Sequence, residues 1–331
     1  MASRRYLDQR LRSSLLRAVD AIEKHRSLLK ASASLGLTQP ALTKNLQELE
    51  ELFQLRLFDR HTRGVRPTEA GTVVVRSARR ILAELRRLDE ELDFLALPGG
   101  ASVALGALPV AAAGMLPGAL TRLKAEHPEI RVRLQEGRTE ELLPLLAAGE
   151  IDLIVGRLYQ PQVPDGLERE ALWSEPISIL ARAGHPLFLS EPVSLEALRR
   201  YDLVLPTITQ RVGQEIENLL SKLDLASITS FHSSSYGFIR EMLHGTDAIA
   251  VMPQLLMVGD LLRGTLRVVP LPIAAPDRPA GLILPRGRPL PPAGYVFVSC
   301  LRAHVTELAN RGIAQPITGC YSKAGRSNTT S

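Results

Sequence analysis

The segment from Gln39 to Gln47 carries side chains that can read the edges of DNA bases. If the segment is helical, its leucines lie on one side and its amide, hydroxyl and ammonium groups lie on the other. Glutamine can bond bidentately to adenine, threonine offers thymine a hydroxyl and a methyl group, and lysine can reach guanine or a phosphate. No carboxylate precedes Glu48 on this helix, so its first turns suit entry into the major groove. The candidate base-reading residues are Gln39, Pro40, Thr43, Lys44 and Gln47.

The excess positive charge of the chain surrounds that segment. Residues 1–67 contain 13 Lys and Arg against 7 Asp and Glu, a net charge of +6, whereas the remaining residues sum to −1. A basic patch confined to a small segment is the expected footprint of phosphate contacts. A solvated basic surface without a partner would give the same count, so the charge supports DNA binding without deciding it.

Three short helices are predicted to hold the candidate residues in place. Apolar residues at helical spacing predict a first helix around Leu15 and Ile22 and a second helix that ends at Gly36. Thr38 has the position of an N-cap for the third helix, and Pro40 falls in its first turn, where the missing N–H costs nothing. The sequence therefore predicts a small helical domain over residues 1–67.

A long helix is predicted over residues 68–97. Thr68 is placed to cap it, and Glu69 puts a negative charge where the helix dipole favours one. Apolar residues then recur at alternating steps of four and three, which is typical of a helix that pairs with another helix. A single helix lying on its own globular domain is the alternative, but the arginine-rich flanks lack the second apolar face it needs. The predicted dimerisation residues are Val74, Ala78, Ile81, Leu85, Leu88, Leu92 and Leu95.

From Ala101 onward, apolar strands and helices alternate, which predicts an α/β domain with a mostly parallel, helix-covered sheet. The cycle repeats after residue 186, so we expect two lobes within residues 101–310. Crossovers near Arg182 and Pro279 would divide the chain into lobe I, at about 101–182 and 280–310, and lobe II, at about 183–279. Residues 311–331 are mostly small and polar and are expected to form a disordered tail.

Ligands of open α/β lobes bind at the carboxyl ends of strands, so residues after the predicted strands are candidates for effector binding. Arg157 stands out, because an arginine directly after a buried strand needs either a partner or a wet cavity. It could anchor a carboxylate, or it could pair with Glu136 or Asp152 and only stabilise the lobe. For the other candidates the alternative is ordinary loop packing. The candidates are Leu108, Pro109, Val110, Arg138, Thr139, Arg157, Pro206, Thr207 and Tyr236.

A resemblance to a known family rests on several segments of the first seventy residues. Residues 32–44, SASLGLTQPALTK, resemble the winged helix-turn-helix signature of LysR-type transcriptional regulators. The similarity continues through LQELE at 46–50, LFDR at 57–60 and GVRPTEAG at 64–71, without an internal gap. One departure is the pair Arg26-Ser27, where the family usually has a glycine before its second helix.

The resemblance implies roles for several parts of the chain. Thr38 to Gln47 would belong to the recognition helix, and residues 56–67 would form a wing with Arg63 and Arg66 near the minor groove and backbone. The long helix would dimerise the protein, and the two lobes would form an effector-binding domain similar to periplasmic binding proteins. The implied partners are a double-stranded DNA operator, a small-molecule effector, RNA polymerase and further copies of the chain, as a homodimer or homotetramer.

Two segments of the C-terminal part resemble one branch of that family. They are Asp152–Leu158 and the stretch from Ser174 to Leu187. The branch includes regulators of protocatechuate breakdown and of sugar-binding-protein expression. We therefore expect a regulator that activates or represses a target operon in response to an organic or aromatic acid, with a sugar as the alternative.

The sequence argues against two other classes, an enzyme and a solute-binding protein. It contains no P-loop, GxGxxG or GxSxG motif, and its seven histidines are not spaced as metal ligands, so we expect no catalysis, metal or cofactor. Residues 1–12 are polar with no apolar segment behind them, which predicts no secretion signal. With two cysteines and no membrane-length apolar run, a cytoplasmic location is expected.

Overall fold

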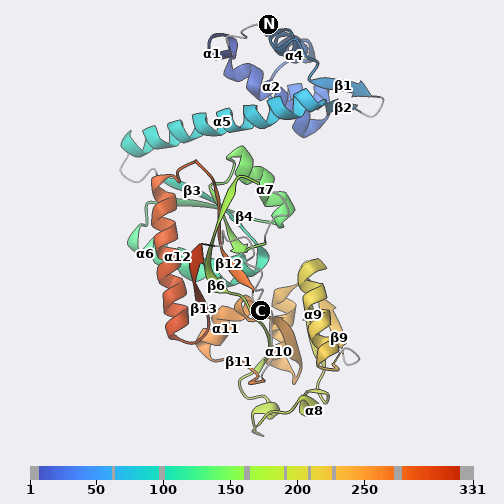
Figure 1. The fold of residues 1–331 in the computed structure, drawn as a ribbon, viewed down its shortest axis with the longest axis vertical. Helices are drawn as coiled ribbons and strands as arrows, with labels where there is room; N and C mark the ends of the chain where they lie inside the picture. The colour runs from blue at the N-terminus through green and yellow to red at the C-terminus, as the bar shows by residue number, and fades with distance from the viewer. Residues whose placement is uncertain are drawn as a thin grey trace, which may run out of the picture. The chain divides into compact units, whose positions relative to one another are not determined.

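The computed structural model describes residues 7–61, 64–96, 101–159, 165–189, 192–207, 210–225, 229–271 and 278–320 (Figure 1). The chain divides into two compact units, the first made mostly of residues up to Gly100 and the second beginning at Ala101. The division falls between Gly100 and Ala101, after the long helix.

The first unit is a helical domain with a two-stranded wing. Its core joins the leucine stripes of α2 and α4 to Leu57 and Phe58 at the start of the wing and to Val65 within it. Strands β1 and β2 pair antiparallel. The elements are α1 (Leu7–Arg10), α2 (Ser13–His25), α3 (Leu28–Ser34), α4 (Gln39–Phe53), β1 (Phe58–His61), β2 (Gly64–Pro67) and α5 (Glu69–Ala96).

The turn between α2 and α3 is built without the family's usual glycine. Arg26 adopts the left-handed conformation there, with φ at 50°, and its N–H donates to the carbonyl of Ile22. The carbonyl of Arg26 accepts a hydrogen bond from the N–H of Val65 in the wing. A Cβ at Gly64, where φ is +126°, would lie 2.6 Å from that carbonyl oxygen. The turn keeps its geometry at the cost of strain in a non-glycine residue.

Side-chain caps start α4 and α5 as the sequence predicts. The Thr38 hydroxyl accepts from the N–H of Ala41 at 3.4 Å, and Pro40 lies in the first turn of α4. The Thr68 hydroxyl accepts from the N–H of Gly71 at 3.0 Å at the start of α5. The Arg79 guanidinium of α5 then donates to Asp20 and Glu23 of α2, so the first turns of α5 are fixed to the helical domain.

The predicted pairing stripe of α5 divides into two parts. Ala78 is buried and Val74 is half-buried, and both pack into the core of their own domain. Farther along the helix the apolar side chains are exposed by about half of their surface, and the Leu95 side chain lies outside the described residues. The exposed members are Ile81 (41%), Leu85 (47%), Leu88 (53%) and Leu92 (53%).

The second unit contains two sheets. The six-stranded sheet has the order β13-β6-β12-β5-β3-β4, and the five-stranded sheet has the order β11-β7-β10-β8-β9. The strands are β3 (Ser102–Ala107), β4 (Arg131–Glu136), β5 (Leu153–Arg157), β6 (Leu167–Ser174), β7 (Ile177–Arg182), β8 (Leu203–Pro206), β9 (Thr229–Ser233), β10 (Ile249–Pro253), β11 (Leu266–Val268), β12 (Pro279–Pro285) and β13 (Gln315–Cys320).

Both sheets are mixed, so the prediction of mostly parallel sheets is wrong. Strand β3 runs parallel to β4 and β5, and β8 runs parallel to β9 and β10. The strands of the long extended crossings, β6, β7 and β12, pair antiparallel with their neighbours, as do the later additions β11 and β13. Only the strands that are connected through a covering helix run parallel, as the alternation of strands and helices in the sequence predicts.

Two predicted boundaries are also wrong. Strand β7 pairs with β10 and β11, so the chain leaves the six-stranded sheet at Glu175 and Pro176 rather than near Arg182. After Arg311 the chain forms strand β13 and not a disordered tail. Its pairing with β6 satisfies backbone hydrogen-bonding groups, and the composition of this segment does not reveal that pairing. Residues 321–331 lie outside the described part.

Helices cover both sheets. Helices α6 and α12 pack against each other and contribute to the largest core cluster, α7 packs beside β5, and α9 packs on the five-stranded sheet. Within the described ranges, no helix is long and apolar enough to cross a membrane. The helices are η1 (Ala111–Met115), α6 (Leu116–Glu126), α7 (Thr139–Ala148), η2 (Pro186–Leu189), α8 (Leu195–Leu198), α9 (Gln210–Lys222), α10 (Tyr236–Gly245), η4 (Gln254–Met257), α11 (Val258–Arg263) and α12 (Pro292–Asn310).

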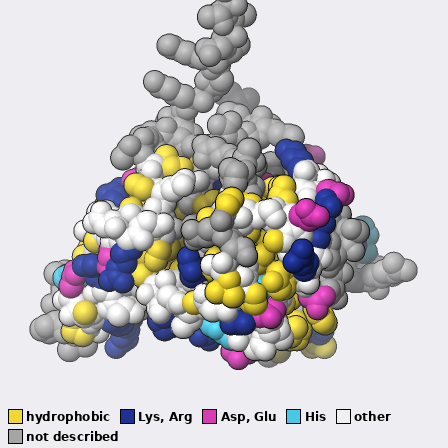
Figure 2. All heavy atoms as spheres, turned by 90° about the horizontal axis from the view of Figure 1, so that it is seen from below, with side chains coloured by type: hydrophobic (Ala, Val, Ile, Leu, Met, Phe, Trp, Pro, Cys, Tyr) yellow, Lys and Arg dark blue, Asp and Glu magenta, His cyan; other side chains and the backbone are white. Residues whose placement is uncertain are grey.

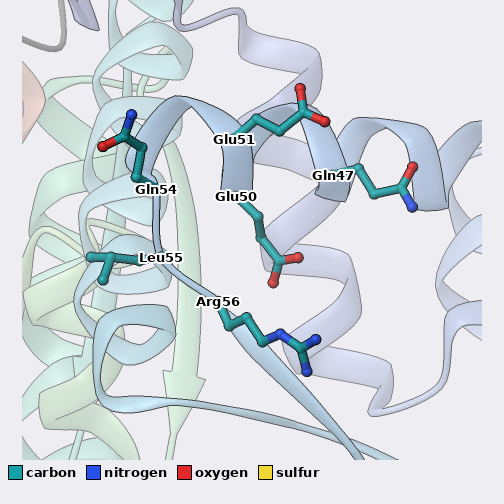
Figure 3. Close-up of a pocket in the computed structure, with 6 residues that line it drawn as sticks. All are labelled: Gln47, Glu50, Glu51, Gln54, Leu55 and Arg56. Carbon is teal, nitrogen blue, oxygen red and sulfur yellow. The ribbon is translucent and has the colours of Figure 1, made fainter.

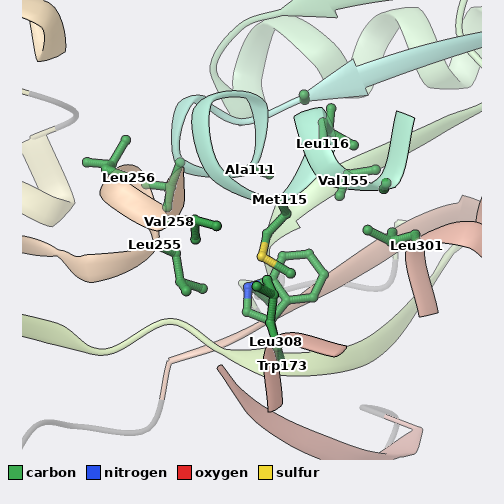
Figure 4. Packing of buried hydrophobic residues seen from close by; sticks show 14 of the residues in the cluster. Ala111, Met115, Leu116, Val155, Trp173, Leu255, Leu256, Val258, Leu301 and Leu308 are labelled. Atoms are coloured by element: carbon green, nitrogen blue, oxygen red, sulfur yellow. The ribbon is translucent and has the colours of Figure 1, made fainter. Parts of the chain in front are cut away.

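One hydrophobic core reaches from the first sheet to the second. Trp173 at the end of β6 is fully buried, and Met115 of η1 and Leu255 of η4 belong to the same cluster (Figure 4). The cluster includes Leu105 of the six-stranded sheet and Val204 of the five-stranded sheet. The two lobes therefore share packed side chains near the crossings, and a displacement of side chains in one lobe can be transmitted to the other.

Candidate functional site

The exposed side of the first turns of α4 carries most of the residues that the sequence predicts to read bases. Gln39, Lys44 and Gln47 are exposed, as are Thr38 and Pro40, while the leucines of the same helix are buried. Thr43 is half-buried, and its hydroxyl donates to the carbonyl of Gln39 at 2.9 Å. The Thr43 oxygen can still accept a hydrogen bond, and its methyl group remains available for contact with a base.

Acidic residues occupy the opposite end of α4. Glu50 and Glu51 line a shallow hollow there with Gln47, Gln54, Leu55 and Arg56 (Figure 3). Glu50 Oε1 accepts from the N–H of Leu57 at 2.7 Å, which ties the end of α4 to the start of the wing. Two carboxylates disfavour a phosphate backbone, so the first turns of α4 are the part that suits the duplex.

The wing presents Arg66 to solvent. Arg66 lies on β2 opposite Asp59 of β1 and is exposed. Arg63, which falls between β1 and β2 in the sequence, lies outside the described residues. The Thr68 hydroxyl donates to the carbonyl of Arg56 at 2.8 Å, so the same residue that caps α5 also holds the base of the wing. This hydrogen bond joins the segment before β1 to the segment after β2.

Several of the predicted effector-binding residues are packing residues in this structure. Leu108 and Val110 are buried, Pro206 is buried, and Pro109 is half-buried. Leu108 fills the space beside Gly156, where a Cβ would lie 2.6 Å from the Leu108 Cβ and where φ is +153°. Gly156 is required there for both reasons, and Arg157 follows it directly.

The remaining strand-end candidates lie nearer to solvent. Arg138 and Thr207 are exposed, while Thr139 and Tyr236 are half-buried. The backbone N–H of Arg138 donates to Glu141 of α7, which leaves its guanidinium available. Tyr236 begins α10, and burial together with the negative charges of Glu136 and Glu175 raises its pKa to about 12. Tyr236 is therefore a neutral hydrogen-bonding group at neutral pH.

Arg157 has a partner that the sequence does not suggest. Its Nη1 and Nη2 donate to the two carboxylate oxygens of Glu215 at 2.8 and 2.9 Å, a bidentate ion pair. Arg157 ends β5 of the six-stranded sheet, whereas Glu215 lies on α9, which packs on the five-stranded sheet. The sequence suggests Glu136 or Asp152 as alternative partners of Arg157. The Asp152 carboxylate instead accepts a hydrogen bond from the N–H of Ala104. The ion pair therefore joins the two lobes.

A second arginine meets the same carboxylate. Arg278, directly before β12, is fully buried, and its Nη1 contacts Glu215 Oε2. Its Nε donates to the carbonyl of Glu175 at 2.7 Å, and its Nη2 lies 3.8 Å from Glu175 Oε2. Glu175 is also buried, at the point where the chain crosses between the sheets. Arg157, Glu175, Glu215 and Arg278 form what we term the interlobe charge cluster.

Burial sets the charges of this cluster. It raises the pKa of Glu175 to about 7 against the opposing effect of Arg278 and Arg157. Burial also lowers the pKa of Arg278 to about 10, with further lowering by the positive charge of Arg157. Arg278 is therefore a cation at neutral pH, while Glu175 is divided between its two protonation states.

Glu175, Glu215 and Arg278 are not among the site residues that the sequence predicts. Glu175 and Arg278 each precede a proline at a crossing between sheets, which is the signal that could have found them. Glu215 gives no such signal on its own helix. Among the described residues, no three His, Cys, Asp or Glu side chains come together to hold a metal ion.

A winged helix-turn-helix whose α4 is free of acidic residues in its first turns, joined by a long helix to a two-lobed α/β domain, is the architecture of a DNA-binding regulator with a C-terminal sensing domain. The comparisons with known families agree. Residues 13–72 match the bacterial regulatory helix-turn-helix proteins of the lysR family, and residues 99–306 match the LysR substrate binding domain. The chain belongs to the LysR family of transcriptional regulators.

Characterised relatives cover most of the chain. The transcriptional regulator PcaQ of Agrobacterium fabrum is 30% identical over 83% of this chain and 89% of its own length. GalR of Pseudomonas putida is 31% identical over 86% of this chain and 72% of its own length. GbpR of Azospirillum brasilense is 28% identical over 94% of this chain and 92% of its own length.

Solved structures share the fold. A full-length OxyR variant from Pseudomonas aeruginosa has a TM-score of 0.61 at 23% identity, covering 88% of this chain and 95% of that one. The LysR family regulator CbnR has a TM-score of 0.58 at 19% identity, covering 89% of this chain and 99% of that one. At these identities the similarity establishes the architecture alone.

Proposed function

We propose that this regulator responds to a small effector bearing a carboxylate, which binds between the two lobes and is anchored by Arg157. The observation that carries this proposal is the pair of guanidiniums at the lobe junction, from Arg157, whose side chain is 11% exposed, and from Arg278, which is fully buried. A planar guanidinium binds a carboxylate bidentately, as Arg157 already does with Glu215. An organic or aromatic acid suits this site better than a neutral sugar, which offers no charge.

The output of the protein is the control of a target operon. The acid-free face of α4 would read operator bases, with Arg63 and Arg66 of the wing near the minor groove and backbone. The exposed stripe from Ile81 to Leu92 would pair two copies of α5, because unpaired apolar side chains at heptad spacing gain by burial. A homodimer or homotetramer on DNA would contact RNA polymerase, in the cytoplasm. Activation and repression are both compatible with this arrangement.

Outside the first 67 residues, the positive and negative charges of the chain nearly balance. On the face shown in Figure 2, side chains of both charge signs are interspersed with apolar ones. Residues 68–331 sum to a net charge of −1, in contrast to +6 for residues 1–67. Phosphate binding is therefore assigned to the first unit.

Thermal unfolding of the purified full-length protein tests the effector proposal. A panel of small aromatic and aliphatic carboxylates is compared with the corresponding uncharged amides. Carboxylates, and not amides, are expected to raise the midpoint of unfolding, since only a ligand that binds the folded protein stabilises it. Arg157→Ala should abolish the response while operator affinity is retained.

Arg286→Ala is the matched control, because Arg286 is an exposed arginine at the far end of β12. Its response to carboxylates should equal that of the unmodified protein. Equal stabilisation by acids and amides, or an undiminished response in folded Arg157→Ala, would overturn the proposal.

A further inference from the structure

We propose that Glu215 is an internal ligand of the effector site: its carboxylate occupies the position of an effector carboxylate on Arg157 and Arg278, and an anionic ligand must displace it. This inference rests on the proposed function, which supplies the competing carboxylate. The proposed function does not include Glu215, its competition with the effector or the effect of its displacement on the coupling between the lobes.

The Glu215 carboxylate is bound by two arginine side chains, as a ligand carboxylate would be. Arg157 grips both carboxylate oxygens at 2.8 and 2.9 Å, and Arg278 contacts one of them from a second direction. The side chains of Arg157, Glu215 and Arg278 are 11%, 20% and 0% exposed. Two guanidiniums on one carboxylate, screened from solvent, form a strong anion site.

The occupant does not satisfy the site completely. Within the interlobe charge cluster, Arg157 Nε, Glu175 Oε1 and both Nη1 and Nη2 of Arg278 are buried and make no hydrogen bond with any described residue. Buried polar groups without hydrogen bonds are costly, so a ligand that offers further oxygens or hydroxyls can bind more favourably than Glu215. A carboxylate with an additional polar substituent fits this description.

Glu215 is attached to the opposite lobe from Arg157. The buried face of α9, made by Val212, Ile216 and Leu219, packs on the five-stranded sheet, while Arg157 ends a strand of the six-stranded sheet. Replacing Glu215 by a free anion would keep the guanidiniums paired but would remove the link from α9 to the other lobe. Ligand binding would thereby alter the coupling between the lobes through differential contacts in the two states.

A static clamp is the competing interpretation, in which the pair only stabilises the domain. The two interpretations differ in what removal of Glu215 does to anion binding. If Glu215 is an internal ligand, its removal vacates an anion site, and small carboxylates bind more tightly. If the pair is only a clamp, its removal lowers stability and leaves anion affinity unchanged.

Chemical rescue provides the test, with formate as the probe and formamide as its neutral counterpart. In the full-length protein, Glu215→Ala should lower the unfolding midpoint, and formate should raise it again at concentrations that leave the unmodified protein unaffected. We expect formate to bind Glu215→Ala at least about tenfold more tightly than it binds the unmodified protein, because the site is then permanently available. Chloride at equal ionic strength controls for screening.

Glu217→Ala is the matched control, since Glu217 is an exposed glutamate on the same helix. It should show neither the loss nor the rescue. Glu215→Gln, which keeps the shape of the side chain, tests the competition if Glu215→Ala folds poorly: it should bind carboxylates from the effector panel about tenfold more tightly than the unmodified protein.

The outcomes separate this inference from the proposed function. Carboxylate binding that depends on Arg157 but is unchanged by Glu215→Gln would overturn the inference and leave the proposed function standing. Formate rescue of Glu215→Ala without binding of any panel carboxylate to the unmodified protein would support the internal ligand and count against the proposed effector. Equal action of formate and formamide would overturn the inference.

Discussion

Replacing Glu175 by glutamine should change how the stability of the protein depends on pH. The Glu175 carboxyl is buried at the crossing between the sheets, and its pKa is raised from 4.5 to about 7. The folded state therefore binds this proton more tightly than the unfolded chain does. The stability that this group contributes is fully present below pH 4.5 and is lost as the pH rises toward 7.

The magnitude follows from the size of the pKa change. Each pKa unit corresponds to 1.36 kcal/mol, so a shift of this size corresponds to about 3 kcal/mol between the low-pH and high-pH limits. Glutamine resembles the protonated acid in shape and cannot ionise. Glu175→Gln should match the unmodified protein near pH 4.5 and exceed its stability by about 3 kcal/mol at pH 8.

Urea unfolding measured from pH 4.5 to 8 on both proteins provides the assay. The difference between the two free energies of unfolding isolates Glu175, because every other titrating group is common to both. Parallel pH profiles would refute the reasoning, since they would mean that Glu175 ionises freely in the folded state. Glu168→Gln, at an exposed position of β6, is the matched control.

The remaining predictions concern the first unit. Gln39→Ala should cost about 1–3 kcal/mol on the specific operator and little on random DNA, measured by titration; equal losses would exclude base reading. For Lys44→Ala, a salt slope reduced by about one unit in a binding titration would identify a phosphate contact, and an unchanged slope a base contact. Leu85→Glu should yield monomers in sedimentation, because pairing would bury an unpaired charge, and an unchanged oligomer would contradict the α5 pairing. Arg26→Gly should raise the stability to urea by about 0.5–1 kcal/mol by relieving the left-handed conformation, and an equal or lower stability would contradict this strain.

Much of the first unit is predictable from the sequence because its determinants are local. Thr38 and Thr68 cap their helices through N–H groups three residues away, and the leucines of α4 recur at the helical period. The reading face of α4 follows from the same period, since what is not buried must be exposed. Even the missing glycine is a local matter: Arg26 takes the conformation that the turn demands.

The strand pairing of the second unit is not predictable from local sequence patterns. The alternation of strands and helices predicts two α/β lobes, but it does not reveal that β6, β7 and β12 pair antiparallel. Strand β13 depends on an open edge of β6, and that edge exists only after the sheet has formed. Strand pairing is a property of chain segments far apart in the sequence, so local periodicity carries no record of it.

The interlobe charge cluster is the clearest case of tertiary determination. The sequence alone marks Arg157 as an arginine that requires a partner, since a buried strand precedes it. The identity of the partner, Glu215, comes from 58 residues farther along and from the other lobe. Arg278 joins them from a third segment, and the burial that shifts the pKa of Glu175 exists only where the chain crosses between the sheets. Composition and period determined which residues form helices, strands and reading faces, whereas the pairing of buried charges depended on which distant segments the folded chain brings within hydrogen-bonding distance.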